Sequence, residues 1–471
     1  MGKIHNLRIV ILFRSLISFF PLQASIMRSD SIKGWKAGVA KINITPTGEL
    51  WMGGYGFRTH PSEGEITSLW AKALSIEDES GNQAVLITLD VIGISKSISD
   101  SIRDRLEKKY NLSRSQVILN ASHTHSGPAI DGNLFDIYPM DSIQWENVKY
   151  YSRKLEDMIV DVVGRSLISM VPVKLFSGNG VTRFQVNRRN NNEQDLEEQT
   201  ELRGPNDYAV PVLKIVNQDD RLLAIAFGYA CHGTVLRSYK WNGDYMGFAQ
   251  IELEKSHPEA LALFFQGAGG DQNPLPRSSF ALARQYGCEL ACSVERVLNE
   301  KMKGLDPILK TVYSEIELKM KKPLGKNELQ KKVIKSSDYE KRWAQRLLGE
   351  VKIGKILPDS YLYPMEVWKL GNQLLIALGG EPTVEYAIQM KRLFGPDSFI
   401  LGYSNDVMSY IPTSRMLKEG GYEGSTSQMA YGLPSPWKSD IENRIIVEIT
   451  ELAGQVGVVP IRIVKKKKNS Y

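Results

Sequence analysis

The sequence predicts an α/β or α+β fold, built on one large mixed β-sheet or two packed sheets that helices flank. Short apolar runs rich in β-branched residues recur along the chain, and such runs are typical of strands buried on both faces. Stretches with helical periodicity alternate with them and supply the cover that such strands require. The composition agrees, because 471 residues that are 42% hydrophobic and 24% charged can form a globular protein with a sizeable core.

Six runs are predicted to be strands. In chain order they occupy residues 84–94, 116–122, 222–230, 262–269, 374–380 and 398–404. Four segments have the spacing of amphipathic helices, and these are residues 97–110, 146–170, 283–302 and the region 434–454. The alternation of the two kinds of segment predicts a mixed sheet with helices packed on its faces.

Two stretches are predicted to be inserted into this core. Residues 187–207 are polar and are expected to form a long loop, which in a compact domain is either functional or mobile. Residues 318–350 are rich in lysine and mostly helical in pattern, and we expect a solvated helical excursion there. The sequence contains no internal repeat and no Pro/Gly/Ser linker that would divide it. We therefore expect residues 35–460 to form one domain, followed by a basic tail at 461–471.

The first residues predict a signal peptide at 1–24. Basic residues precede an apolar stretch, which is followed by a small-residue cleavage site that ends at Ala24. We therefore expect a secreted or periplasmic protein, and the alternative is a later start at Met27. The three cysteines are too few for a disulfide framework, and they do not fix the compartment.

The charge balance excludes one class of function. The chain has 59 Lys and Arg against 53 Asp and Glu, and part of this excess lies in the lysine run 465–468. A nucleic-acid-binding protein would need a basic face, and the sequence contains no such stripe. The tail could attract an anionic membrane surface at about 1 kcal/mol per lysine, although a frayed soluble terminus is the favoured interpretation. The sequence indicates no protein partner.

Polar residues follow nearly every predicted strand, and three of the six histidines in the chain are among them. In open α/β sheets, ligands bind beyond the carboxyl ends of the strands. The sequence therefore predicts a functional site at these strand ends. In chain order the polar residues are His123, His125, His232, Asp271, Asn273, Glu381, Asp406 and Tyr410.

The His-x-His pattern of His123 and His125 indicates a metal site. On an extended segment the side-chain direction has a period of two, so both imidazoles would point to the same side. A third histidine and a carboxylate, such as His232 and Glu381, would complete a Zn²⁺ site with one position open to water. Each of these residues taken singly is more often structural, and it is their combination at strand ends that favours a metal.

The motifs around these residues resemble the neutral/alkaline non-lysosomal ceramidase family, zinc-dependent amidases that cleave the N-acyl bond of ceramides. The matching segments follow the order of the family and extend from Gly38 to the 430s. The C-terminal immunoglobulin-like domain of the family is not expected, because the chain ends soon after the catalytic-type segment. The segments are AGVAKINITP…MGGYG (38–56), NASHTHSGP (120–128), VNRR (186–189), ACHGT (230–234), GDYMGFAQIELEK (243–255), FFQGAGGDQNP (264–274), LGGEPT (378–383) and SYIPT…YEGSTS (409–427).

The resemblance implies four ligands for about one Zn²⁺ per chain, namely His123, His232, Glu381 and Tyr410. A zinc ion lowers the pKa of its bound water from about 15.7 to about 7, which makes hydroxide available at neutral pH. The implied function is hydrolysis of the N-acyl amide bond of ceramide, or of a related N-acyl lipid or amide. The protein would then act in sphingolipid metabolism on a lipid-like substrate.

Three further residues have roles that the resemblance implies. Arg188 lines the substrate site and Tyr422 lies near the scissile bond, and either one could stabilise the developing oxyanion. His125 is the catalytic neighbour of the metal and could pass a proton to the leaving amine. An equally weighted alternative for Arg188 is a salt bridge to the acidic loop 193–201.

Asn273 marks a departure from the family. The family reads Gly-Asp-Val-Ser-Pro where this chain reads Gly-Asp-Gln-Asn-Pro at 270–274. Asparagine can hydrogen-bond a carbonyl but cannot serve as a nucleophile, so an acyl-enzyme at this position is excluded and the zinc-water route remains.

Two alternative functions stay open. A metal-dependent esterase or phosphoesterase is disfavoured by the few carboxylates, and a catalytically silent binding protein is disfavoured by the retained ligand set.

Overall fold

A nine-stranded mixed β-sheet forms the larger half of the core. Its strands join in a path β4-β3-β2-β1-β5-β7-β8-β9, and β11 adds to β5. Neighbours on this path are antiparallel except for the parallel pairs β3–β4 and β8–β9. The bounds are β1 Trp35–Asn43, β2 Trp70–Glu77, β3 Gln83–Leu89, β4 Val117–Ala121, β5 Val171–Val181, β7 Ala209–Asn217, β8 Leu222–Tyr229, β9 Leu261–Gln266 and β11 Lys303–Leu305.

A second sheet, of four strands, stacks on the first. Leu263 and Phe265 of the larger sheet share one buried cluster with Trp368 and Leu375 of the smaller sheet. The mixed α/β architecture predicted from the sequence is therefore confirmed, in its form with two packed sheets. The strands of this sheet are β12 Leu309–Lys319, β13 Ser360–Leu370, β14 Gln373–Leu378 and β16 Phe399–Leu401.

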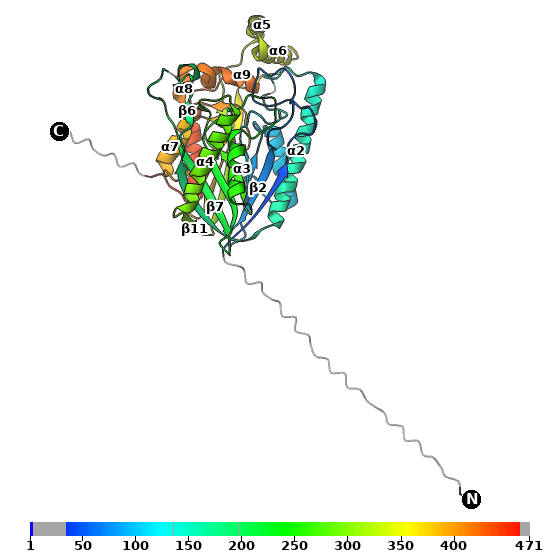
Figure 1. Cartoon of the computed structure of the whole chain (residues 1–471). Coiled ribbons are helices and arrows are strands. Elements are labelled where there is room, and N and C mark those ends of the chain that lie inside the picture. Colours follow the sequence, from blue (N-terminus) through cyan, green and yellow to red (C-terminus); the bar gives the residue numbers. More distant parts are fainter. Residues whose placement is uncertain (3–33, 135, 197, 462–471) are drawn as a thin grey trace, which may run out of the picture. The chain divides into compact units, whose positions relative to one another are not determined.

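Helices cover the outer face of each sheet, so the central strands are buried on both faces. In β8, Ala224 and Ala226 face the second sheet, whereas Ile225 and Phe227 join the cluster beneath the helices. Figure 1 shows α3 and α4 lying over the strands of the larger sheet. The covering helices are α1 Lys96–Tyr110, α2 Ser142–Ile168, α3 Asp244–Ser256 and α4 Phe280–Asn299 on the larger sheet, and α7 Val384–Phe394 and α10 Ile441–Gln455 on the smaller one.

The predicted strands and helices are present, although several are shorter than expected. The run 84–94 is extended only to Leu89, and 398–404 contributes only Phe399–Leu401. The remainder of each run turns to form the loops above the strand ends. The helix predicted in the region 434–454 begins only at Ile441.

The lysine-rich segment 318–350 is largely helical and solvated, as predicted, but one of its faces is buried. Its first residues end β12, and a helical hairpin of α5 (Lys326–Lys335) and α6 (Asp338–Lys352) follows. The apolar face of α6 packs on α9 (Ser427–Tyr431), and Trp343 is buried there, with its indole N–H donating to the carbonyl of Leu433 at 2.9 Å. Exposed lysines surround this apolar face, so the sequence pattern of the segment indicates a solvated helix and not a packed one.

Asn120 ties three strand ends together. Its amide nitrogen donates to the carbonyl of Gly402 at 2.7 Å and to that of Gln266 at 3.3 Å, and its amide oxygen accepts from the backbone N–H of Gln266 at 2.7 Å. Asn120 lies in β4 and Gln266 ends β9, and these are the two edge strands of the larger sheet. The loops that follow β4, β8, β9 and β16 are thereby gathered in one place.

The structure is a computed structural model, and it describes residues 1–2, 34–134, 136–196 and 198–461. The predicted signal peptide lies outside the described residues apart from its first two, and so does the basic tail apart from Ile461. Among the described helices, none has both the length and the apolar character that crossing a bilayer requires.

Candidate metal centre and catalytic site

The His123–His125 segment is a turn and not the extended strand that the sequence pattern predicts. β4 ends before it, and His123 has a φ of 59°, in the left-handed region. Thr124 then forms a parallel bridge with Gly233, which holds the turn against the segment that carries His232. The two rings still lie together, with Nε2 of His125 3.3 Å from Nε2 of His123. The prediction of extended backbone is wrong because tertiary contacts fix the turn.

Two imidazole nitrogens and one carboxylate oxygen converge in the centre of the site. Nε2 of His123 lies 3.3 Å from Oε2 of Glu381, and Nε2 of His232 lies 3.1 Å from the same oxygen. All three side chains are buried. They come from separate parts of the chain, since His123 follows β4, His232 follows β8 and Glu381 begins the short strand β15 (Glu381–Pro382).

Backbone carbonyls hold each ring so that Nε2 faces Glu381. Nδ1 of His123 lies 2.6 Å from the carbonyl oxygen of Ile92, and Nδ1 of His232 lies 2.9 Å from that of Gly269. A carbonyl only accepts, so each Nδ1 carries the proton and each Nε2 presents a lone pair. Such carbonyl contacts are the usual outer-shell support of a metal-binding histidine.

Tyr410 is the fourth predicted ligand, and it lies beside the other three. β15 pairs in parallel with β17 (Tyr410–Ile411), and Glu381 stands opposite Tyr410 in that ladder. The Tyr410 hydroxyl is 3.1 Å from Nε2 of His232. Two imidazoles, a carboxylate and a phenol offer the nitrogen and oxygen donors that Zn²⁺ accepts, so the residues fit this metal.

The electrostatics of the site keep these donors in their metal-binding forms. Burial opposes ionisation of Glu381, but the adjacent imidazoles of His123 and His232 outweigh this effect and hold the pKa of Glu381 well below its ordinary value. Burial lowers the pKa of His232 to about 4, and the positive charge of Arg188 adds to this effect. At neutral pH the site therefore offers an ionised carboxylate and a neutral His232 imidazole.

Two tyrosines that the sequence reasoning missed bind the carboxylate of Glu381. The Tyr431 hydroxyl donates to Oε1, and the Tyr403 hydroxyl donates to Oε2 at 3.3 Å. Tyr403 stands at the end of a predicted strand, as the other site residues do, and that position was the available signal. Tyr431 comes from α9, and its neighbours carry no signal of a role in the site.

His125 lies against the same cluster, and its ring contacts His123 and makes no direct hydrogen bond to Glu381. One nitrogen from each of His123, His125 and His232 lies within 4.8 Å of the others, a grouping that could hold a metal ion. Burial, followed by the charges of His123 and His232, lowers the pKa of His125 well below its ordinary value. Gly54 packs on the ring, since a Cβ there would lie 2.5 Å from Nδ1 of His125.

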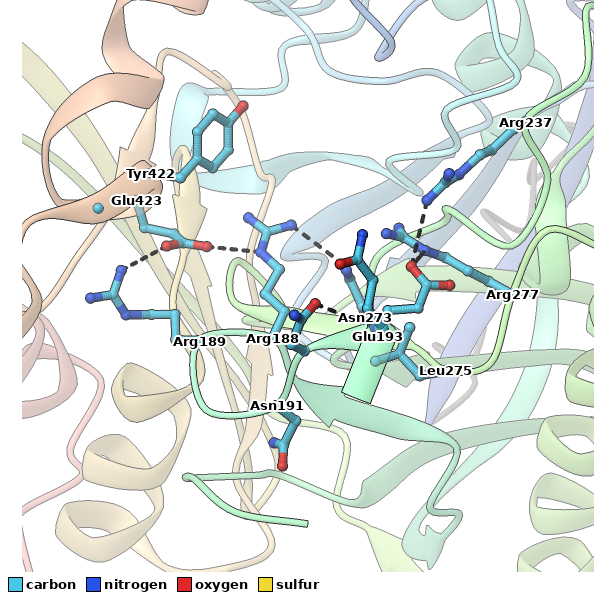
Figure 2. Close-up of a pocket in the computed structure, with 13 residues that line it drawn as sticks. Arg188, Arg189, Asn191, Glu193, Arg237, Asn273, Leu275, Arg277, Tyr422 and Glu423 are labelled. Carbon is cyan, nitrogen blue, oxygen red and sulfur yellow. Dashed lines mark hydrogen bonds and ion pairs between the residues drawn. The ribbon is translucent and has the colours of Figure 1, made fainter. Parts of the chain in front are cut away.

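Arg188 lies beside the cluster, and its salt-bridge partner is not the acidic loop. Nε of Arg188 donates to Oε1 of Glu423 at 2.8 Å, and Arg189 binds the other oxygen of Glu423 at 2.8 Å. Glu193 of the loop instead binds Arg277 at 2.8 Å. The alternative of an ion pair between Arg188 and the loop 193–201 is therefore wrong, because folding brings Glu423 closer. Figure 2 shows both arginines directed at Glu423.

Asn273 and Tyr422 complete the set of predicted residues and line a pocket of about 700 Å³ together with Arg188 (Figure 2). Asn273 lies on β10 (Gln272–Pro274), which pairs with β6 (Gln185–Asn187), and its amide oxygen is 3.4 Å from Nη1 of Arg188. Tyr422 begins a π-helical turn after α8 (Ser414–Glu419), and its ring centroid is 5.3 Å from that of Tyr410. The structure thus brings into one neighbourhood the four residues predicted as metal ligands and the four predicted around the scissile bond, namely His123, His125, Arg188, His232, Asn273, Glu381, Tyr410 and Tyr422.

Comparison with known proteins places this chain in a family. The layered fold is a mixed α/β architecture that holds the buried histidine and carboxylate cluster at its strand ends. The chain belongs to the neutral/alkaline non-lysosomal ceramidase family, because a model of the N-terminal part of that family matches residues 35–352. The resemblance noted from the motifs is thereby confirmed.

Individual relatives agree with the family. The neutral ceramidase of Drosophila melanogaster is 24% identical over 238 residues, which are 47% of this chain and 32% of that protein. The neutral ceramidase of Pseudomonas aeruginosa is 27% identical over 268 residues, which are 52% of this chain and 38% of that protein. This chain therefore aligns with about a third of the length of these curated relatives.

A solved structure shows the same fold. The crystal structure of neutral ceramidase from Pseudomonas aeruginosa superposes with a TM-score of 0.70 at 18% sequence identity, and it covers 91% of this chain and 75% of that chain. A ceramidase in complex with C2 superposes with a TM-score of 0.69. The two-sheet architecture is thus the architecture of the family.

Proposed function

We propose that this protein is a zinc-dependent amidohydrolase that cleaves the N-acyl amide bond of ceramide or of a related N-acyl lipid. One observation carries the proposal, which is that Nε2 of His123 and Nε2 of His232 meet one oxygen of Glu381 in a buried site at the strand ends. The relatives are named neutral ceramidases, which supports an amide as the substrate.

A zinc ion held by His123, His232, Glu381 and Tyr410 would supply Lewis acidity and a water whose pKa falls from about 15.7 to about 7. The residues of the chain prepare that site. The two histidines keep their Nδ1 protons on backbone carbonyls, so no proton has to leave Nε2 before a metal binds. The negative charge of Glu381 offsets part of the charge of a divalent cation.

Arg188 and Tyr422 are the residues that would stabilise the oxyanion of the amide carbonyl. Nη2 of Arg188 is buried and has no acceptor among the described residues, so it is free to donate to a substrate. The phenol of Tyr422 is protonated at neutral pH, because tyrosine ordinarily ionises at about pH 10, and its hydroxyl is therefore able to donate. Removing one such donor from an oxyanion site typically costs about 10²- to 10³-fold in kcat.

His125 is suited to move the proton from the attacking water to the leaving amine. Its ring is neutral before the reaction, because burial and the neighbouring histidines lower its pKa. A neutral ring can accept a proton and then release it to the amine nitrogen. Asn273, in the position of the serine of the family, can hydrogen-bond the carbonyl through its amide and cannot form an acyl-enzyme.

Zinc content and hydrolysis measured on the same samples test this proposal. Wild-type protein, His232→Ala and His257→Ala would be analysed for bound metal and for release of fatty acid from a short-chain ceramide. His257 is a matched control, because it pairs with Glu295 at the protein surface, outside the site. We expect about one zinc per chain and hydrolysis in wild type and in His257→Ala, with both lost in His232→Ala.

Each other outcome counts against part of the proposal. If the wild-type protein binds no zinc, either as purified or after reconstitution with the metal, the metal assignment is overturned. Zinc bound at full occupancy without hydrolysis of ceramide or of other N-acyl amides would contradict the proposed reaction and favour a silent relative.

A further inference from the structure

The pocket beside the candidate metal site is polar, although the proposed substrate class has long alkyl chains. Of its thirteen lining residues, four are arginines, two are glutamates and four carry side-chain amides. Leu275 and Tyr422 are the large apolar or aromatic side chains among them. An alkyl chain placed here would bury its surface against groups that need hydrogen-bond partners, which costs free energy instead of releasing it.

The arginines of this pocket form two pairs with different charge balance. Arg188 and Arg189 share Glu423, and Arg189 is also bound at 3.0 Å by Glu419, so that pair is neutralised. The second pair, Arg237 and Arg277, has a single carboxylate partner among the described residues, which is Glu193.

Arg237 and Arg277 both approach the same oxygen of Glu193. Nε of Arg277 lies 2.8 Å from Oε2, and a terminal nitrogen of Arg237 lies 3.6 Å from it. Among the described residues, the two guanidinium groups therefore share this one carboxylate, and Arg237 is also 43% exposed to solvent. Figure 2 shows the two guanidinium groups directed at this one carboxylate.

Asp244 is the other carboxyl group that acts electrostatically on Arg277, and it does so from outside the pocket. Asp244 is fully buried, and its oxygens accept hydrogen bonds from the backbone N–H groups of Leu236 and Tyr245. It does not line the pocket. The lining of the pocket thus holds four arginines and two glutamates, and Nη2 of Arg188 has no hydrogen-bond partner among the described residues.

We propose that Arg237 and Arg277 bind a negatively charged substituent of the substrate, so that the preferred substrate is an anionic N-acyl amide and not a neutral one. The charged group is a carboxylate, sulfate or phosphate, each of which a guanidinium fork binds by charge-assisted hydrogen bonds. This inference rests on the proposed amidase function. It adds the charge of the preferred substrate, which the metal site does not specify.

Matched pairs of ligands test the charge preference. The substrates are N-dodecanoyl ω-amino acids with linkers of two to six carbons, each compared with its primary carboxamide, which has the same shape without the charge. The corresponding dodecylsulfonamides cannot be cleaved as amides, and they report binding by titration calorimetry whether or not hydrolysis occurs. For at least one linker length we expect the carboxylate to bind, and to be hydrolysed in terms of kcat/KM, about tenfold better than its carboxamide at low ionic strength, a difference of about 1.4 kcal/mol. The preference should shrink as salt is added.

Three variants make the test specific. Arg277→Gln and Arg237→Gln should each reduce the preference for the carboxylate, whereas Glu193→Gln removes the competing carboxylate and should increase it. Arg296→Gln is the charge-matched control, because Arg296 lies exposed on α4 and pairs with Glu300 away from the pocket. It should keep the wild-type preference.

The binding and hydrolysis measurements together distinguish a failure of the anion subsite from a failure of the proposed reaction. Preferential sulfonamide binding that Arg277→Gln abolishes, without hydrolysis of any amide, would keep the anion subsite and refute the reaction. Hydrolysis of acids and carboxamides at equal kcat/KM for every linker would keep the reaction and overturn the subsite. A preference that survives in the double variant of Arg237 and Arg277 would also overturn it.

Discussion

Tyr431 donates a hydrogen bond to Oε1 of Glu381, while His123 and His232 approach Oε2 of the same carboxylate at 3.3 and 3.1 Å. Oε1 is thus held by the phenol of Tyr431, whereas Oε2 faces the two imidazoles and also accepts from the Tyr403 hydroxyl at 3.3 Å. This division fixes the rotation of the carboxylate group, and it keeps Oε2 directed at the place where a metal would bind.

We predict that Tyr431→Phe lowers zinc affinity by about 10- to 100-fold, the usual effect of removing an outer-shell partner of a metal ligand. Competition with a zinc chelator measures this. Tyr151→Phe is the control, because it also removes a buried tyrosine hydroxyl, one that donates to the carbonyl of Ile44 away from the site. Equal zinc affinity in the two variants would show that Tyr431 does not orient Glu381.

Glu423 is expected to position Arg188 for catalysis. In Glu423→Gln the charged partner 2.8 Å from Nε of Arg188 is lost, and the guanidinium group can turn away from the carbonyl site. We expect kcat to fall about 10- to 100-fold with unchanged zinc content. Glu419→Gln, which removes an exposed partner of Arg189, should leave kcat near wild type. An unchanged kcat in Glu423→Gln would contradict this role.

Gly54 is expected to be required for the position of His125. A Cβ at residue 54 would lie 2.5 Å from Nδ1 of His125, so Gly54→Ala should displace the ring and lower kcat by about tenfold or more while zinc stays bound. Gly64→Ala is the matched control, since Gly64 also has a positive φ, of 132°, but has open space where its Cβ would be. Equal losses of kcat in both variants would mean that backbone strain, and not the contact with His125, causes the effect.

Asp406 is expected to make stability depend on pH. Burial raises its pKa from the ordinary 3.8 to about 7, although the Tyr361 hydroxyl donates to it at 2.7 Å and Lys96 acts to lower the value. Asp100 and Glu315, the other charged groups that act on Asp406, raise it further. The folded protein therefore holds this proton more tightly than the unfolded chain does.

The sign of the effect follows from that difference in proton binding. The stabilisation is fully present below about pH 4 and is lost as the pH rises through about 7. Urea unfolding at pH 5 and pH 8 should show a decrease attributable to this group of about 3 kcal/mol in wild type. Asp406→Asn should remove that part of the decrease. A variant with the same pH dependence as wild type would contradict the assignment.

The sequence by itself determined the strands and helices of the core and the kinds of residue at the site. Strands buried on both faces are visible as continuous apolar runs, because both Ala226 and Phe227 of one strand must avoid water. The position of polar residues directly after such runs was sufficient to predict that His123, His232 and Glu381 would be neighbours, because strand ends gather at the edges of sheets.

The tertiary structure alone decided how those residues are held. The left-handed turn at His123 depends on a bridge between Thr124 and Gly233, more than a hundred residues apart. Tyr431 and Glu423 belong to the site only because their segment folds over the strand ends, and Glu423 displaces the nearby loop as the partner of Arg188. A sequence pattern records which residues prefer burial or a strand, since those preferences are local. It does not record which distant side chain completes a hydrogen bond, because that is settled when the two sheets and their loops pack together.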